Sequence, residues 1–160
     1  MSSDRDALPL LGRGFFWQDL SIGQRFRTFR RTVTETDLVN FIGVTGMLEA
    51  IFIDAGFEGG AIAGRPVPAA LTYALVEGLL LQSMIQGTGL ASLELHQKIL
   101  KPVLVGDTIQ AEVEVTALRQ TSSRNRAVVT SRVDVRNQHL ECVMSYDVTR
   151  LLAGREEAAA

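Results

Sequence analysis

The chain has 160 residues, of which 46% are hydrophobic and 21% are charged, which predicts one globular domain with a substantial core. Its net charge of −2 offers no basic excess for a nucleic-acid backbone, and the single cysteine, Cys142, excludes an intrachain disulfide. The most apolar stretch, residues 69–85, is interrupted by polar residues, so it predicts a buried core helix rather than a membrane span.

The two ends of the chain are expected to lie outside the folded domain. Residues 1–14 and 152–160 are predicted to be flexible, with a single domain over residues 15–151. The N-terminus lacks a basic segment followed by a long apolar run, so we expect no secretory signal and a cytoplasmic location.

The first half of the chain predicts one strand and two helices. A strand over residues 25–33 leads into a near capping box formed by Thr34 and Asp37, which predicts a short helix. Residues 47–67 are rich in glycine and predict an irregular segment. From Pro68 a second helix is apolar almost all round, so it must be enclosed on nearly every side.

The second half predicts antiparallel strands. Residues 90–100 form one expected strand, and the period-two alternation of residues 111–117 and 129–136 predicts two more. A hairpin at residues 137–139 then leads into a closing strand over residues 140–151. One enclosed helix followed by such strands is an α+β plan, in which a curved antiparallel sheet wraps one long central helix.

Four segments stand out along the chain: a strand-to-helix entry at 32–41, a helix start at 65–72, a Pro-Val-x-x-Gly-Asp-Thr turn within 101–108 and a late hairpin at 135–138. In this order they resemble the MaoC-like (R)-specific enoyl-CoA hydratases of the hot-dog fold. The resemblance covers about residues 15–150. The resemblance implies a MaoC-like dehydratase domain that binds acyl-CoA thioesters.

The family's catalytic segment runs Thr/Ser-Gly-Asp-x-Asn-Pro-x-His-x-Asp, and residues 45–54 align with it. Gly46 and Asp54 match, but Met47 replaces the general-base Asp and Phe52 replaces its partner His. A thioether and a phenyl ring cannot exchange protons with water. The resemblance therefore implies a hydratase that lacks the usual acid/base pair.

Two carboxylates, Glu49 and Asp54, remain in this segment as candidate catalytic residues. Glu49 is the leading candidate base, because burial among apolar residues makes a carboxylate a better proton acceptor. The alternative is that Glu49 faces solvent or pairs with an arginine such as Arg65. Asp54 occupies a motif position that usually supports the loop, which favours a structural role.

The resemblance also implies that the thioester lies along the central helix, with its oxygen held by N–H groups of the first turn. Unpaired N–H donors and the helix dipole suit a developing oxyanion. By correspondence, Ala69 and Ala70 would supply these donors. Arg65, Lys98 and Lys101 are candidates for meeting the CoA phosphates. The other predicted substrate-binding residues are Met47, Phe52, Pro68 and Tyr73.

Three functions stay open at this point. The first is an enoyl-CoA hydratase or dehydratase with a non-standard acid/base set. The second is a catalytically inactive acyl-CoA-binding subunit that partners an active MaoC-like chain. The third is an acyl-CoA thioesterase that uses Glu77 of the central helix, although Glu77 and Tyr73 also fit a polar seam of that helix.

The remaining expectations concern metals, cofactors and assembly. His96 and His139 are far apart and have no cysteine partner, so no metal site and no cofactor are expected. A lone sheet around one helix leaves strand edges to cover, which predicts a homodimer or a larger homo-oligomer.

Overall fold

A computed structural model describes residue 8, residues 10–122 and residues 124–156; most of the predicted flexible termini lie outside these residues. The helices are the 3-10 helix η2 (Trp17–Asp19), α1 (Glu35–Thr45), α2 (Ala50–Ile53) and α3 (Ala69–Ser83). The strands are β1 (Arg25–Arg27), β2 (Arg31–Thr32), β3 (Gly89–Ile99), β4 (Thr108–Gln120), β5 (Arg126–Arg136) and β6 (Cys142–Ala153).

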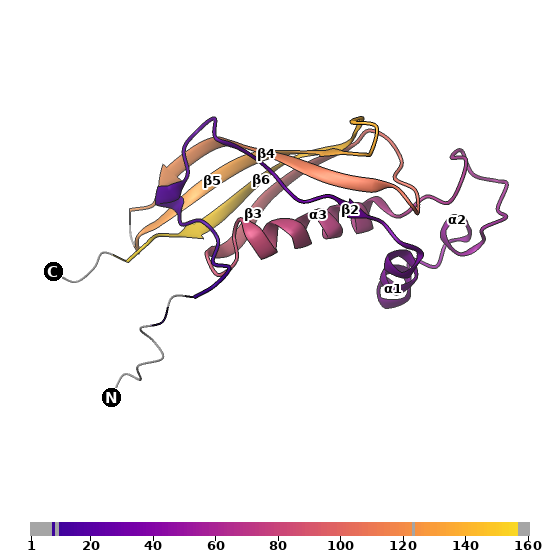
Figure 1. Cartoon of the computed structure of the whole chain (residues 1–160), viewed down its shortest axis with the longest axis horizontal. Helices are drawn as coiled ribbons and strands as arrows, with labels where there is room; N and C mark the ends of the chain where they lie inside the picture. Colours follow the sequence, from indigo (N-terminus) through magenta and orange to yellow (C-terminus); the bar gives the residue numbers. More distant parts are fainter. Residues whose placement is uncertain (1–7, 9, 123, 157–160) are drawn as a thin grey trace.

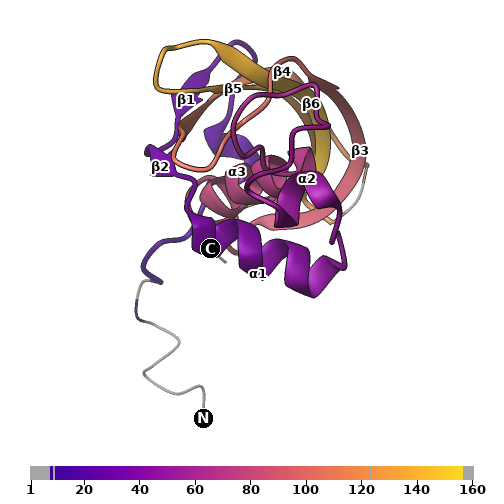
Figure 2. The same ribbon diagram turned by 90° about the vertical axis from the view of Figure 1, so that its right-hand side faces the viewer.

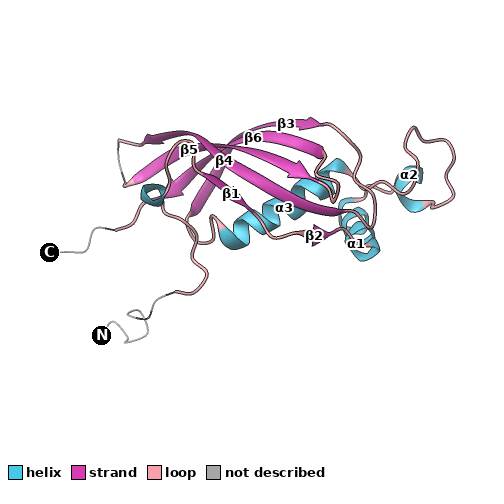
Figure 3. Ribbon diagram, turned by 45° about the horizontal axis from the view of Figure 1, so that its top comes forward, coloured by secondary structure: helices cyan, strands magenta, loops and turns pink. Residues whose placement is uncertain are grey.

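The described strands form a six-stranded antiparallel sheet in the order β1-β4-β5-β6-β3, with β2 paired to β4 off this path. The sheet curves over α3, which lies along its concave face (Figures 1 and 2). Helices α1 and α2 gather at the end of the molecule where α3 begins (Figure 3). The predicted α+β plan, with a curved sheet around one long helix, is confirmed.

The alternation of β4 shows how the sheet builds the core. Ala111, Val113 and Val115 are at most 1% exposed, because every second side chain of a strand points to the same face. The register shifts between Val115 and Ala117, and Ala117 is exposed as a result. A bulge of this kind ends the alternation without ending the strand.

The predicted strand over residues 25–33 is divided into β1 and β2 at Thr28. The Thr28 hydroxyl accepts a hydrogen bond from the Ala111 N–H at 3.0 Å, and the Thr28 carbonyl accepts one from Gln110 Nε2 at 2.7 Å. Side-chain groups therefore occupy positions that backbone groups would fill in a continuous ladder. This local competition explains the break.

Helix α3 is less enclosed within one chain than its sequence predicts. It buries Leu71, Thr72, Val76 and Leu80. Ala74 on another side of the helix is exposed, and Leu81 is 49% exposed. The sheet therefore covers one side of the helix and leaves an apolar side open.

The sheet continues beyond the predicted domain end. Strand β6 runs to Ala153, and Leu152 is 1% exposed in the core. The predicted C-terminal tail therefore begins with two residues that belong to the sheet. Across the described residues, every helix is too short or too polar to cross a membrane.

The capping box predicted at the start of α1 is confirmed. The Asp37 N–H donates to Thr34 Oγ1 at 3.2 Å, and the Thr34 N–H donates to Asp37 Oδ2 at 2.8 Å. Burial alone would raise the Asp37 pKa, but hydrogen bonds from Thr34 and Arg31 outweigh it and lower the pKa. The stability that Asp37 contributes is therefore present at neutral pH and is lost as the pH falls through its folded-state pKa.

Replacing the Thr34 cap tests this helix start. Thr34→Ala removes the oxygen that accepts from Asp37 N–H, so we expect a loss of about 1 kcal/mol in the free energy of unfolding. Chemical denaturation measures the loss, and Thr34→Ser, which keeps the oxygen, serves as the control. Equal stability of the alanine variant and the parent chain would contradict the role of the cap.

Candidate functional site

The segment that aligns with the family's catalytic motif lies between α1 and α3. Gly46 ends α1 with a φ of 73°, a left-handed conformation that glycine adopts at low cost, and the chain then turns into α2. Arg65 fastens this segment: its Nη2 donates to the Phe52 carbonyl at 3.2 Å, and its Nη1 lies 2.5 Å from Glu35 Oε1. Arg65 therefore already has two partners within the chain. A phosphate group of CoA would have to compete with Glu35 for the Arg65 guanidinium.

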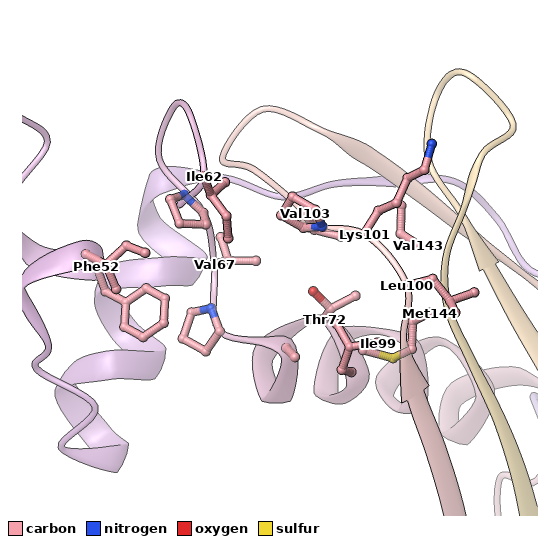
Figure 4. A pocket seen from close by; sticks show the side chains of 15 residues that line it. Phe52, Ile62, Val67, Thr72, Ile99, Leu100, Lys101, Val103, Val143 and Met144 are labelled. Atoms are coloured by element: carbon pink, nitrogen blue, oxygen red, sulfur yellow. The ribbon is translucent and has the colours of Figure 1, made fainter. Parts of the chain in front are cut away.

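An apolar cavity of about 350 Å³ lies at the start of α3 (Figure 4). This volume is at the small end of the roughly 300–1,000 Å³ typical of ligand pockets. Within its lining, as far as the chain is described, Thr72 and Lys101 carry the polar side-chain groups. The lining also includes Ile51, Phe52, Val67, Pro68, Ala69, Ile99, Leu100, Val103, Val143 and Met144.

A second, more open hollow of about 450 Å³ lies beside this cavity. Phe52, Pro68 and Ala69 line both spaces. The second hollow is also lined by Gly46, Met47, Leu48, Glu49 and Ala70. The structure therefore brings most of the predicted site residues together around the first turn of α3, while Asp54, Arg65 and Tyr73 line neither space.

The first turn of α3 has free hydrogen-bond donors. Pro68 is its N-cap and provides no side-chain cap, while the N–H groups of Leu71 and Thr72 both donate to the Pro68 carbonyl. The N–H groups of Ala69 and Ala70 have no acceptor among the described residues. Free donors at a helix N-terminus favour an anionic or strongly polarised oxygen.

The two candidate carboxylates each bond to a nearby backbone amide. Glu49 Oε2 accepts from the Ile51 N–H at 2.9 Å and so caps the short helix α2. Asp54 Oδ1 accepts from the Gly56 N–H at 2.9 Å, which is the loop-supporting contact that its motif position implies. Both residues are exposed, and Glu49 lies at the open hollow rather than in the apolar cavity.

Glu77 belongs to a buried polar cluster between α3 and β6. Its Oε1 accepts from the Tyr146 hydroxyl at 2.8 Å, and Arg150 Nη2 lies 2.6 Å from both Glu77 oxygens. The Tyr73 ring packs edge-on against the Tyr146 ring, 5.2 Å away. Burial, followed by the charge of Glu77, raises the pKa of Tyr146, so its hydroxyl stays protonated as a donor.

The sequence of β6 contains a pattern that indicates a buried partner for Arg150, although no such partner is predicted above. Met144, Tyr146, Val148, Arg150 and Leu152 alternate on the buried face of β6. An arginine on that face must have a buried partner, because an unpaired buried charge is very costly. The signal shows that a partner exists, but which carboxylate it is depends on how α3 lies on the sheet.

The remaining candidates lie away from this region. His96 is exposed, with its Nε2 2.9 Å from Glu94 Oε1, and His139 is also exposed. Burial raises the pKa of the Cys142 thiol, which makes it a poor nucleophile at neutral pH. Across the part of the chain that the structure describes, no group of three or more metal-binding side chains comes together.

Comparison with known proteins identifies the family. Residues 18–138 match the model of the MaoC like domain. The chain belongs to the MaoC-like domain family. An (R)-specific enoyl-CoA hydratase from Aeromonas caviae is 29% identical over 116 residues, which are 72% of this chain and 84% of that protein.

Solved structures of other proteins share the fold. A MaoC-like dehydratase from Rhodospirillum rubrum has a TM-score of 0.81 and 25% identity, covering 90% of this chain and 100% of that one. A conserved hypothetical protein from Mycobacterium tuberculosis with a double hotdog fold has a TM-score of 0.77 and 17% identity, over 92% of this chain and 46% of that one. The predicted hot-dog fold is confirmed.

The Glu77–Arg150 pair gives a stability prediction. Arg150→Met leaves the Glu77 carboxylate buried without its ion partner, so we expect a loss of about 3 kcal/mol in the free energy of unfolding. Urea denaturation measures it. The double variant Glu77→Gln/Arg150→Met removes both charges and should recover much of the loss. If the double variant were no more stable than Arg150→Met, the unpaired charge would not be the cause.

Proposed function

We propose that this MaoC-like chain binds an acyl-CoA thioester and adds or removes water across its 2,3 double bond. The acyl group would occupy the apolar cavity, and the thioester oxygen would accept from the N–H groups of Ala69 and Ala70. The observation that carries this proposal is the position of those two free donors: Ala69 lines the cavity of about 350 Å³, and Ala69 and Ala70 both line the open hollow beside it. Membership of the MaoC-like family supports the same reaction class.

Glu49 is the proposed base. The Ile51 N–H holds Glu49 Oε2, while Oε1 has no hydrogen-bond partner among the described residues. In the hydration direction, Oε1 would take a proton from water as the water oxygen bonds to C3. The electron pair of the double bond moves toward the thioester oxygen, where the two helix N–H groups stabilise the enolate. The protonated Glu49 then returns its proton to C2, which completes the addition of water and restores the carboxylate. Met47 and Phe52 beside Glu49 offer no exchangeable proton.

A second candidate is the non-catalytic subunit. Its support is that the described lining of the apolar cavity contains no carboxylate and no imidazole, while Glu49 is exposed. The match to 46% of a double-hotdog protein is consistent with pairing between two such units, of which one could carry the acid/base pair. A thioesterase that uses Glu77 has less support, because Arg150 and Tyr146 already hold that carboxylate.

We also propose that the chain forms at least a homodimer through the β3 edge. Every residue of β3 is exposed, although the strand pairs with β6 on one side. Leu95 is 40% exposed and Ile99 is 53% exposed on this strand. The apolar side of α3 that the sheet leaves open is a second surface that a partner chain would cover. Pairing would bury the strand edge and these side chains together.

Light scattering on the purified chain tests the assembly. We expect at least twice the single-chain mass of 17.5 kDa. Leu95→Lys, which adds a charge to the exposed edge strand, should shift the population toward the single chain. A parent protein found only at 17.5 kDa would contradict the proposal.

The base is tested with crotonyl-CoA as substrate. Glu49→Gln keeps an oxygen that can accept from the Ile51 N–H but cannot take a proton, so we expect kcat to fall about 100-fold or more. Loss of the enoyl absorbance measures the rate. Asp54→Asn is the matched control, because it makes the same chemical change in the same segment; its rate should stay within a few-fold of the parent chain.

The outcome also separates the two candidates. A parent chain that is inactive alone, and active only when mixed with a second MaoC-like chain that carries the Asp/His pair, supports the subunit function. Under that outcome Glu49→Gln should leave the activity of the mixture unchanged. Full activity of Glu49→Gln in an active parent chain would rule Glu49 out as the base.

A further inference from the structure

We infer that the site accepts short-chain acyl groups and rejects long ones, because the Tyr146–Glu77–Arg150 cluster closes the space between α3 and β6 behind Met144. This inference rests on the proposed binding of an acyl thioester at the start of α3. Beyond that binding, we infer a maximum length for the acyl chain and name the residues that set this maximum.

Two buried residues, one from α3 and one from β6, form part of the lining of the apolar cavity. Thr72 comes from α3 and Met144 from β6, and both side chains line the cavity (Figure 4). Each residue is 1% exposed, and Gln97 Nε2 lies 2.9 Å from Met144 Sδ, which holds the thioether from the β3 side. A ligand that enters from the first turn of α3 therefore meets a packed wall here.

The space beyond that wall is already filled. The next residue of β6 on the same face after Met144 is Tyr146, which is 1% exposed. From the helix, Tyr73 packs against the Tyr146 ring, and Glu77, one turn further, accepts from the Tyr146 hydroxyl. Arg150 completes the cluster from β6. The two elements that frame the cavity thus meet through polar groups directly behind it.

These groups resist displacement by a hydrocarbon tail. A longer acyl chain would have to move Tyr146 and break its hydrogen bond to Glu77, leaving a buried carboxylate with one partner fewer. It would also place apolar carbons against an ion pair whose two side chains, Arg150 and Glu77, are only 9% and 17% exposed. An apolar tail provides no hydrogen bond in return, so each carbon beyond Met144 weakens binding.

The parent chain can be tested directly with a series of 2-enoyl-CoA substrates from crotonyl to dodecenoyl. We expect kcat/KM to fall about tenfold or more between crotonyl-CoA and dodecenoyl-CoA, because a pocket that cannot hold one more methylene typically discriminates by 10-fold or more. Equal kcat/KM for the two substrates would overturn the inference, whatever its effect on the proposed reaction.

A pair of variants locates the limit. Met144→Ala opens the wall in front of Tyr146, so the kcat/KM ratio of octenoyl-CoA to crotonyl-CoA should rise about tenfold. Val148→Ala is the matched control, since Val148 is also buried on the inner face of β6 but does not line the cavity; its ratio should equal that of the parent. An equal rise in both variants would show that loosening the core, not opening this wall, changes the ratio.

Binding measurements separate failure of this inference from failure of the proposed reaction. Calorimetry with butyryl-CoA and dodecanoyl-CoA needs no turnover. If the chain hydrates no enoyl-CoA but binds butyryl-CoA at least about tenfold more tightly than dodecanoyl-CoA, the proposed reaction fails and the length limit stands. If enoyl-CoAs are hydrated and both saturated ligands bind equally, the reaction stands and the length limit fails.

Discussion

The packing of α3 against the concave face of the sheet is the contact on which the rest of the structure depends. The helix buries Leu71, Val76 and Leu80 against strands whose inner faces are mostly apolar. A helix with so few polar residues gains stability only when such a surface covers it. This packing places the first turn at one end of the sheet, beside the α1–α2 segment that Arg65 ties down.

The candidate site has free backbone donors, while two positions of its aligned motif carry side chains that cannot transfer protons. Backbone donors at the start of α3 depend on helix geometry, so they stay in place with alanine at positions 69 and 70. Proton transfer depends on side-chain chemistry, and there Met47 and Phe52 stand at positions that carry Asp and His in the family pattern. The binding half of the site is thus more tolerant of substitution than the catalytic half.

The Glu77–Arg150 pair links this site to the core. A buried ion pair contributes little net stability compared with apolar packing, but removal of one partner is costly. Its effect is to fix one relative position of α3 and β6, with Tyr146 bonded between them. The same contacts that fix that position close the inner end of the cavity, so core packing and ligand size are set by the same residues.

Features that depend on neighbours in the chain could be read from the sequence alone. The Thr34–Asp37 capping box, the period-two alternation of β4 and β5 and the hairpin at residues 137–139 each arise from contacts within a few residues or from strand geometry. Most of the residues that the family resemblance predicted for the site line the two spaces at the start of α3, but Asp54, Arg65 and Tyr73 do not. Helix α2 was missed because it is a single turn, capped by a carboxylate within an otherwise glycine-rich segment.

The sequence by itself therefore determined the α+β plan, the place of the central helix and the loss of the Asp/His pair, because local propensity and motif positions carry that information. Only the tertiary structure decided that Arg150 and Tyr146 hold Glu77, that Arg65 pairs with Glu35, and that Met144 lines the cavity. Glu77 and Arg150 are 73 positions apart, and their meeting depends on the angle and register at which a helix lies on a sheet. Those quantities arise from the packing of the whole core, and no local pattern encodes them.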